Sequence, residues 1–515
     1  MSRLDLGVGL ALMPGLLDEL ERVADLVDCL EVEPQTFWME TADPQRPFRL
    51  VTEGIDQLRL RFPTILAHGV TSPVGGSQPP SVDMARLFAE SVRRLGAQLA
   101  SEHLSFNRAA GDDGPFGSAF FLPPRQTESG VEAAVAAIAA LRAELDVPFS
   151  FETPVSYLQP RADEIPDGAF VAAVAEAADC GILLDLHNIW TNERNGRQTA
   201  REFLAQLPLD RVSEVHLAGG LERGGFWLDA HSGGLAPELE ALAAEVLPQL
   251  PEVRVVVYEV LPEFVVPRGE RALRPVLERI HRLVDDARRA PSAAPRGPVV
   301  PSPSNGPHTV GDDRPATSPT PSGANPAVNG RGAVAASERP AAWEHVLASL
   351  AIGRAPSAAG TVGLKGSARA EGDRVLTLGV ELSADPGVAL LRELVGAGRD
   401  GRVASSLPLT IELLLVTLGR GGLEELLARY ASETTPALWA SAEGAQFARW
   451  AQDALAEHPI ALAALALDLA GIELMRTEHP QTVELHVDPM LLISAIRTGA
   501  SVADVPTGRF LATVG

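Results

Sequence analysis

Cysteine is scarce in this sequence, which has only Cys29 and Cys180 among 515 residues. Each lies in an apolar context at the start of a predicted strand, where a cysteine behaves as a small buried hydrophobic residue. We therefore expect two buried thiols, with neither a disulfide framework nor a thiolate metal site.

Basic residues are also few relative to acidic ones. The chain has 43 Lys and Arg against 67 Asp and Glu, a formal net charge of −24. A general nucleic-acid binder needs basic side chains to neutralise phosphates, so this balance argues against nucleic acid as a partner. It suits a soluble protein whose copies repel one another.

Long apolar runs are missing as well. No window reaches about 18 uninterrupted apolar residues, the length that a membrane span requires. The closest stretch, 459–472, is broken by Asp468. The N-terminus MSRLDLGVGLALMPG lacks the pattern of a signal peptide, so we expect a cytoplasmic protein without a membrane partner.

What the sequence does contain is a regular alternation. Short apolar runs alternate eight times with longer amphipathic stretches between residue 5 and about residue 290. This pattern predicts an α/β fold, a (β/α)₈ TIM barrel over residues 1–288. The predicted strands are Leu6–Leu10, Cys29–Val32, Thr64–Val70, Leu99–Phe106, Pro148–Pro154, Ile182–Asn188, Glu214–Gly219 and Arg254–Leu261.

Two further regions follow the predicted barrel. Residues 289–338 are rich in Pro, Ser, Gly and Ala, which predicts a disordered linker. Residues 339–515 regain apolar periodicity and should form a smaller, mostly helical α+β domain. Its predicted strands are Val375–Leu382, Thr482–Val487 and Arg509–Val514, and its predicted helices are Ala342–Leu350, Val388–Val395, Thr410–Thr417, Gly422–Tyr430, Gly444–Glu457 and Pro459–Arg476.

Histidines and carboxylates gather at the ends of the predicted barrel strands, where TIM barrels carry their chemistry. The histidines are His68, His103, His187, His216 and His231, and the other polar residues are Glu102, Glu152, Asp185, Asn188, Asp229 and Glu259. A lone buried histidine is usually a hydrogen-bonded structural residue. So many imidazoles and carboxylates in one cavity, however, require a cation to hold them together.

The ligand types narrow the choice of metal. Imidazoles mixed with hard carboxylate oxygens suit iron, manganese or zinc. Asp185 and His187 are two residues apart, so on a regular strand both would reach the cavity. His103 and Glu102 are adjacent, so one should be the ligand and the other should orient it, and we favour His103 as the ligand.

Taken together, the segments AHG, SEHLSF, FET, LLDLHN, EVHLAG, LDAHSG and VYE resemble the multinuclear non-haem iron-dependent oxidative enzymes of the methanobactin and thiaglutamate pathways. The resemblance covers about residues 1–290. It implies a xylose-isomerase-like barrel with two or three iron ions that activate molecular oxygen. The implied metal ligands are His68, His103, Glu152, Asp185 or Asn188, His187, His216, Asp229, His231 and Glu259, with Glu102, Asn188 and Ser105 orienting them.

The sequence departs from the family pattern in three places. Strand five reads FETP instead of the common L-E-N, and the loop NERNG has no histidine after strand six. His187 therefore either compensates for the missing histidine or marks an altered ion site. The segment after the last glutamate reads VLPEF in place of the usual charged tail.

The resemblance also implies a partner. Family members modify ribosomally made precursor peptides, in some cases at cysteine, and usually need a separate protein that binds the peptide leader. The segments 448–476 and 483–505 look like parts of such partner proteins. The chain would then be a fusion of oxidase and peptide-recruiting domain that makes a separate partner protein unnecessary.

Two other interpretations stay open at this stage. A zinc- or manganese-dependent isomerase or phosphoesterase barrel would use similar ligands without redox chemistry. A degenerate barrel could instead serve as a non-catalytic scaffold, although the intact histidine and carboxylate positions argue against that.

Overall fold

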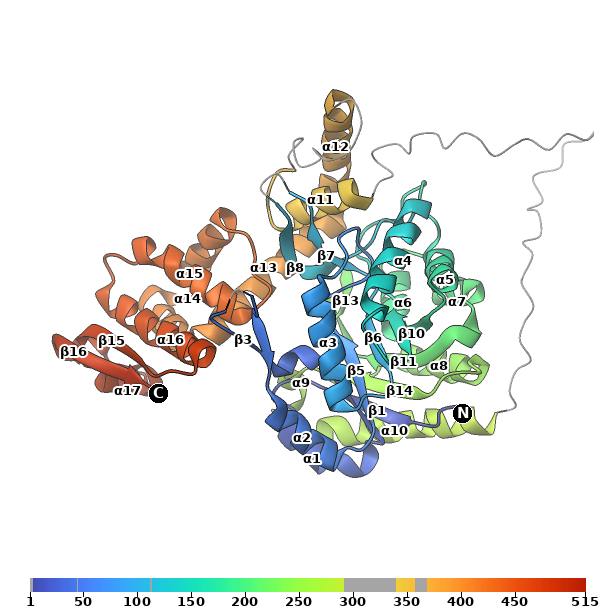
Figure 1. Ribbon diagram of the computed structural model, residues 1–515, viewed down its shortest axis with the longest axis horizontal. Coiled ribbons are helices and arrows are strands. Elements are labelled where there is room, and N and C mark those ends of the chain that lie inside the picture. The colour runs from blue at the N-terminus through green and yellow to red at the C-terminus, as the bar shows by residue number, and fades with distance from the viewer. Residues whose placement is uncertain (1–2, 44, 112–113, 291–339, 357–367) are drawn as a thin grey trace, which may run out of the picture.

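The computed structural model describes the whole chain except residues 1–2, 44, 112–113, 291–339 and 357–367. Eight parallel strands close into a barrel in the order β1-β14-β11-β10-β9-β6-β5-β2, with helices on its outside (Figure 1). This confirms the predicted (β/α)₈ barrel. The strands are β1 (Gly7–Leu12), β2 (Cys29–Val32), β5 (Ile65–Gly69), β6 (Ala100–His103), β9 (Phe149–Glu152), β10 (Gly181–Asp185), β11 (Val212–Ala218) and β14 (Val255–Glu259).

The outer helices form because each carries an apolar stripe that the strands cover. In α10, Leu273, Leu277, Ile280 and Val284 recur at three- and four-residue spacing and are all fully buried. Each such side chain stabilises the fold by about 1.5–3 kcal/mol. The helices of this region are α1 (Leu17–Arg22), α2 (Thr52–Arg61), α3 (Val82–Leu95), α4 (Glu128–Arg142), α5 (Asp167–Ala178), α6 (Leu186–Arg194), α7 (Ala200–Gln206), α8 (Pro237–Val246), α9 (Pro262–Val265) and α10 (Glu270–Arg289).

Three antiparallel hairpins extend the carboxyl rim of the barrel. The pair β3 (Trp38–Glu40) and β4 (Phe48–Leu50) follows β2. The pair β7 (Phe106–Ala109) and β8 (Phe116–Leu122) follows β6, and the pair β12 (Gly220–Arg223) and β13 (Phe226–Asp229) follows β11. Because parallel strands of a barrel end at one rim, all three hairpins rise from the same face.

The C-terminal region contributes to two hydrophobic cores. Helices α11, α12 and the start of α13 share one core with the β7–β8 and β12–β13 hairpins. The end of α13 and everything after it form a second core, which lies to one side of the barrel in Figure 1. The elements are α11 (Pro340–Ala351), α12 (Ala368–Ser383), α13 (Pro386–Ser406), α14 (Pro408–Glu433), α15 (Ala440–Ala454), α16 (Pro459–Thr477), β15 (Gln481–Val487), α17 (Pro489–Thr498) and β16 (Thr507–Val514).

Most elements predicted for the C-terminal region are present, but helix α17 was not predicted, and the helices predicted at Thr410–Thr417 and Gly422–Tyr430 form one kinked helix, α14. The predicted strands at 482–487 and 509–514 are confirmed as the antiparallel pair β15 and β16. The strand predicted at Val375–Leu382 is wrong, because these residues belong to α12. The predicted linker, 289–338, lies outside the described residues apart from its first two positions.

No single helix in the described part of the chain is long and apolar enough to cross a membrane. Helices α13 and α14 meet that test only as a pair, and a bend of 110° separates them. Both cysteines are buried and free, as predicted.

The helical state of α12 gives a sharp test. Leu378 is buried and Val380 is 73% exposed, although on a strand the two would share a face. We expect Leu378→Asp to lower the free energy of unfolding by about 3 kcal/mol, because it buries a charge, and Val380→Asp to change it by less than about 0.5 kcal/mol. Chemical denaturation of the full chain measures both, and equal losses would contradict the helical assignment.

Candidate metal centre

Most of the predicted site residues lie at the carboxyl ends of barrel strands. His68, His103, Glu152, Asp185, His216 and Glu259 come from the ends of β5, β6, β9, β10, β11 and β14. Asp229 ends β13, and His231 follows it with a positive φ of 44°. The barrel therefore brings together residues separated by up to about 190 positions in the sequence, as the strand-end argument predicts.

The first group consists of His68, His103 and Glu152. Glu152 Oε2 lies 3.3 Å from His68 Nε2 and 3.1 Å from His103 Nε2. The other ring nitrogen of each histidine is held by the protein: His68 Nδ1 lies 2.8 Å from Ser101 Oγ, and His103 Nδ1 donates to the Gly69 carbonyl at 3.0 Å. Both Nε2 atoms are thereby directed at the same carboxylate oxygen.

Two predicted orienting residues support this first group. Glu102 Oε1 lies 3.2 Å from His103 Nδ1, and its Oε2 accepts from the Ser72 backbone N–H at 2.9 Å. Asn188 Nδ2 donates to Glu152 Oε1 at 3.1 Å, so Asn188 fixes the carboxylate. Ser105 is buried, and its backbone carbonyl accepts from Gly75. The serine hydroxyl that contacts His68 belongs to Ser101 and not to the predicted Ser105.

The second group, Asp185, His216 and Glu259, combines two overlapping sets of neighbouring ligand atoms, Glu152–Asp185–His216 and Glu31–His216–Glu259. His216 Nδ1 lies 3.2 Å from Glu259 Oε2, and ligand atoms of Glu152, Asp185 and His216 lie within 4.8 Å of one another. His216 Nε2 makes a hydrogen bond of 3.2 Å with Glu31 Oε2. An ionised carboxylate only accepts, so Nε2 carries the proton and Nδ1 is free to bind a cation.

A third group gathers around Asp229. Its Oδ1 lies 3.2 Å from His187 Nδ1 and 3.3 Å from His231 Nε2, and His231 Nε2 lies 3.5 Å from Glu259 Oε2. The indole of Trp227 donates to His187 Nε2 at 3.4 Å. Because an indole can only donate, a neutral His187 must carry its proton on Nδ1, facing Asp229. His187 thus differs from the other histidines of the centre.

The prediction that Asp185 and His187 share a face of strand six is wrong. Strand β10 ends at Asp185, whose Oδ1 accepts from the Asn188 backbone N–H at 2.8 Å and so caps helix α6. His187 therefore lies in the first turn of that helix. It still reaches the centre because the helix begins at the rim.

The sequence analysis missed Glu31, Glu214 and Ser101. Glu31 lies in the strand CLEV, and Glu214 lies two residues before His216 on β11, 3.9 Å from His216 Nε2. All three are buried. A single acid inside an otherwise apolar strand was the available signal, because burying a carboxylate is costly without a partner.

The unpaired atoms test whether these residues fit metal ions. Five carboxylate oxygens and two imidazole nitrogens of the centre are buried without a hydrogen bond: Glu31 Oε1, Glu152 Oε2, Asp185 Oδ2, Glu214 Oε1, Asp229 Oδ1, His187 Nδ1 and His216 Nδ1. A cation about 2.1 Å from each ligand spaces them by about 3.0 Å in an octahedron and about 3.4 Å in a tetrahedron. The separations of 3.3 and 3.1 Å from Glu152 to His68 and His103, and of 3.2 Å from His216 to Glu259, match these edges. The first two groups therefore fit metal ions.

Electrostatics lead to the same conclusion. Burial raises the pKa of Asp185 well above its usual value, and the carboxylates of Glu152, Asp229 and Glu259 raise it further. Burial opposes protonation of His68, but Glu152 and Glu31 outweigh it and raise its pKa to about 10. Burial and the nearby Glu31 raise the pKa of Glu214 to about 7. The excess of carboxylates thus demands positive charge, from protons or from metal ions.

One side of the centre is open. The side chains of His68, Asp185 and His216 are buried, whereas those of His103, Asp229 and His231 are 20%, 18% and 23% exposed. Phe121 of β8 stacks on the His103 ring with centroids 4.0 Å apart. A substrate would therefore approach past the β7–β8 and β12–β13 hairpins.

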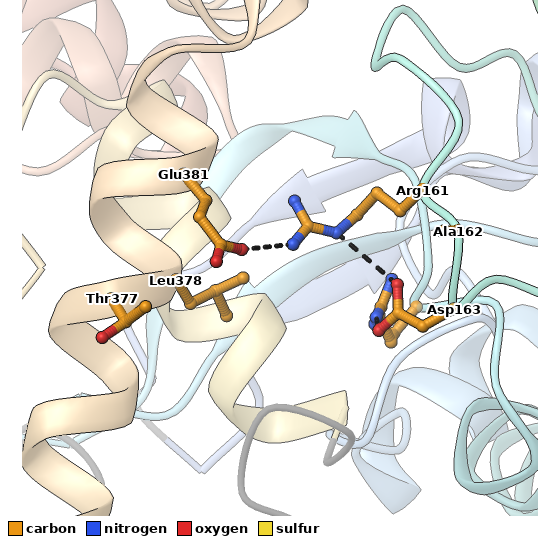
Figure 2. Close-up of a pocket in the computed structure, with 7 residues that line it drawn as sticks. Arg161, Ala162, Asp163, Thr377, Leu378 and Glu381 are labelled. Atoms are coloured by element: carbon orange, nitrogen blue, oxygen red, sulfur yellow. Dashed lines mark hydrogen bonds and ion pairs between the residues drawn. The ribbon is translucent and has the colours of Figure 1, made fainter.

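A separate cavity of about 660 Å³ lies between the 161–163 loop and α12, and no predicted ligand lines it (Figure 2). Arg161 points across it and forms ion pairs with Glu381 and Asp163. These groups already neutralise one another. The ion pair between Arg161 and Glu381 links the barrel to α12 across this cavity, which is distinct from the metal centre.

Comparison with known proteins places this geometry in context. The model of the RiPP precursor modification enzyme family MbnB/TglH/ChrH matches residues 7–283, from the first barrel strand into the last barrel helix. A UPF0276 protein of Streptomyces avermitilis is 30% identical over 243 residues, 46% of this chain and 48% of that protein. The chain thus spans about half the length of this relative.

A UPF0276 protein of Anaeromyxobacter sp. is also 30% identical, over 44% of this chain and 78% of that protein. Among solved structures, a xylose isomerase domain protein of Planctomyces limnophilus is similar over 55% of this chain and 98% of that chain, with a TM-score of 0.36 and 15% identity. The family match spans more than half of the sequence, and so the chain belongs to the RiPP precursor modification enzyme family MbnB/TglH/ChrH.

Proposed function

We propose that this chain is an iron- and oxygen-dependent enzyme that oxidatively modifies a ribosomally made precursor peptide. The observation that carries the proposal is the set of buried, unpaired ligand atoms at the barrel rim, spaced as around metal ions. Family membership supports a precursor peptide as the substrate. Imidazole and carboxylate ligands with open positions are typical of iron enzymes that use oxygen.

In this proposal the first group, His68, His103 and Glu152, holds one ion, and the second group, Asp185, His216 and Glu259, holds another. Ligand atoms of Glu152 lie near those of His68 and His103 and also near those of Asp185 and His216, so Glu152 would help to hold either ion. Bound ferrous iron would supply one-electron redox chemistry with dioxygen.

The protein's own residues do the rest. Ser101, Glu102 and Glu31 hold the second ring nitrogen of His68, His103 and His216, which fixes the tautomer and the direction of each ligand. The Trp227 indole fixes His187, whose Nδ1 proton then faces Asp229. Phe121 covers one face of the His103 ring and so shields that face from water.

We further propose that the module from α14 to β16 recruits the peptide. Within the described residues, β16 pairs only with β15, so its other edge can accept an extended strand. Leu511 on β16 is 71% exposed, and Met490 on α17 of the same module is 73% exposed. An unpaired strand edge with an exposed apolar side chain suits a peptide leader that binds in an extended form.

The central experiment uses the full chain purified without oxygen and loaded with ferrous iron. A peptide encoded by a small reading frame beside the gene serves as the substrate. We expect a mass change in that peptide only when both iron and oxygen are present, together with oxygen consumption. A protein that retains zinc alone, consumes no oxygen and leaves the peptide mass unchanged would sink the oxidase proposal.

The shared position of Glu152 makes a second prediction. Glu152→Ala should lose both ions, whereas His103→Ala should lose only one, because His103 contacts the first group alone. Elemental analysis of metal per chain measures this. Asp146→Asn, whose side chain is 74% exposed, is the control and should keep the full content. Equal losses in Glu152→Ala and His103→Ala would rule out a shared ligand.

Recruitment through β16 makes a third prediction. We expect Leu511→Asp to raise the KM for the precursor peptide by about tenfold, or about 1.4 kcal/mol, and to leave kcat unchanged, because binding is lost and chemistry is not. Leu376→Asp, an exposed position on α12, is the matched control. An unchanged KM for Leu511→Asp would place the leader elsewhere.

A further inference from the structure

Helix α11 is enclosed on all sides. Every residue from 342 to 351 is buried, although successive residues of a helix point about 100° apart. The helix packs against β7, β8, α12 and α13. A helix at the start of a merely tethered domain would expose one face to solvent. Helix α11 exposes none, so it belongs to the structure built on the carboxyl rim of the barrel.

Three consecutive polar side chains of α11 bind three different segments of that face. The Trp343 indole donates to the carbonyl of Pro123, directly after β8, at 3.0 Å. Glu344 accepts from the Ser77 backbone N–H at 2.6 Å and from the Ser77 hydroxyl at 2.5 Å. His345 Nδ1 donates to the carbonyl of Ala110, directly after β7, at 2.8 Å.

The segment held by Glu344 lies directly against the first metal group. The Val74 N–H donates to the His103 carbonyl at 2.9 Å, and the Gly75 N–H donates to the Ser105 carbonyl at 2.8 Å. The Ser72 N–H donates to Glu102, which in turn contacts His103. At Gly76 a Cβ atom would lie 2.8 Å from the Phe106 side chain, so the backbone of the 72–77 loop packs closely against Phe106.

The hairpin held by Trp343 and His345 touches the same ligand from its other side. Its two strands are fixed at Ala110 and at Pro123, and between them Phe121 stacks on the His103 ring at an interplanar angle of 24°. Arg125 lies 5.0 Å above the Trp343 ring and pairs with Asp163 and Glu164. His103 is thus enclosed between the 72–77 loop and the β7–β8 hairpin.

We propose that Trp343, Glu344 and His345 are positioning residues of the metal centre. They hold the 72–77 loop and the β7–β8 hairpin against Glu102 and His103, and so set the geometry of the first metal group. The C-terminal region then completes the site in addition to recruiting a substrate. This inference rests on the metal-binding part of the proposed function and is independent of which metal or reaction is used.

The test compares Glu344→Ala with Glu344→Gln in the full-length chain. Alanine removes both hydrogen bonds to Ser77. Glutamine keeps them, because its carbonyl can accept from the Ser77 N–H and its amide can contact the hydroxyl. The control is Glu393→Ala, which removes an ion pair between α13 and Arg223 on the other hairpin. Trp343→Phe is a second variant that keeps an aromatic ring in the core and loses only the donor to Pro123.

Two measurements are made on metal-free protein under nitrogen. Hydrogen exchange should become at least about tenfold faster in residues 72–77, 106–111 and 114–122 of Glu344→Ala. Titration with cobalt(II) chloride, followed by its visible spectrum, should show affinity at one site reduced by about 10- to 100-fold, the usual effect of losing an outer-shell partner. Glu344→Gln and Glu393→Ala should match the wild type, and Trp343→Phe should share the defect of Glu344→Ala.

The outcomes separate the two proposals. If wild type binds no cobalt, the metal-binding function itself is wrong. If wild type binds cobalt and Glu344→Ala binds it with the same affinity and spectrum, the positioning role is overturned. It is equally overturned if Glu393→Ala weakens cobalt binding as much as Glu344→Ala does, because the effect would then come from general loosening of the interface.

Discussion

Buried carboxylates and imidazoles at ligand distance from one another are the constraint on which this structure depends. Oxygens of Glu152 and Asp185 lie beside histidine nitrogens without hydrogen-bond geometry. Desolvating so many carboxylates costs several kcal/mol for each uncompensated charge. Protons can relieve part of that cost, which is why Asp185 and Glu214 have raised pKa values. Metal ions relieve it at the same positions and leave the carboxylates ionised.

The barrel makes such a cluster possible because it is rigid where the ligands are attached. Each ligand of the first two groups lies within the last three residues of a strand that is hydrogen-bonded on both sides. The orienting groups come from the same strands or from the turns that follow them, such as Ser101 on β6 and Asn188 on α6. A ligand set by this framework loses little side-chain entropy when an ion binds, because its rotamer is already chosen.

The fold and much of the site could be predicted because both depend on local pattern and on one topological rule. Alternating apolar and amphipathic runs predict strands and helices, and strand ends meet at one rim. His187 was placed wrongly because the alternation was extended past Asp185, which instead caps a helix. Val375–Leu382 reads as a strand, yet its buried positions 375, 378 and 382 follow a helical spacing. Glu344 and Ser77 are 267 residues apart, so no local pattern indicates their contact.

The two cores of the C-terminal region show how the module proposed to recruit the peptide is attached to the barrel. A flexible tether would raise only the effective concentration of a peptide-binding domain near the barrel. Here α13 contributes Val388, Leu391 and Val395 to the core shared with the hairpins, and Val403 to the core of the module beyond it. One continuous helix therefore connects the hairpins of the carboxyl rim to the module proposed to bind the leader. Because α13 is packed into both cores, it fixes the position of the module relative to the barrel. A peptide bound to that module would therefore approach the metal centre from a fixed direction, past Phe121 and His103.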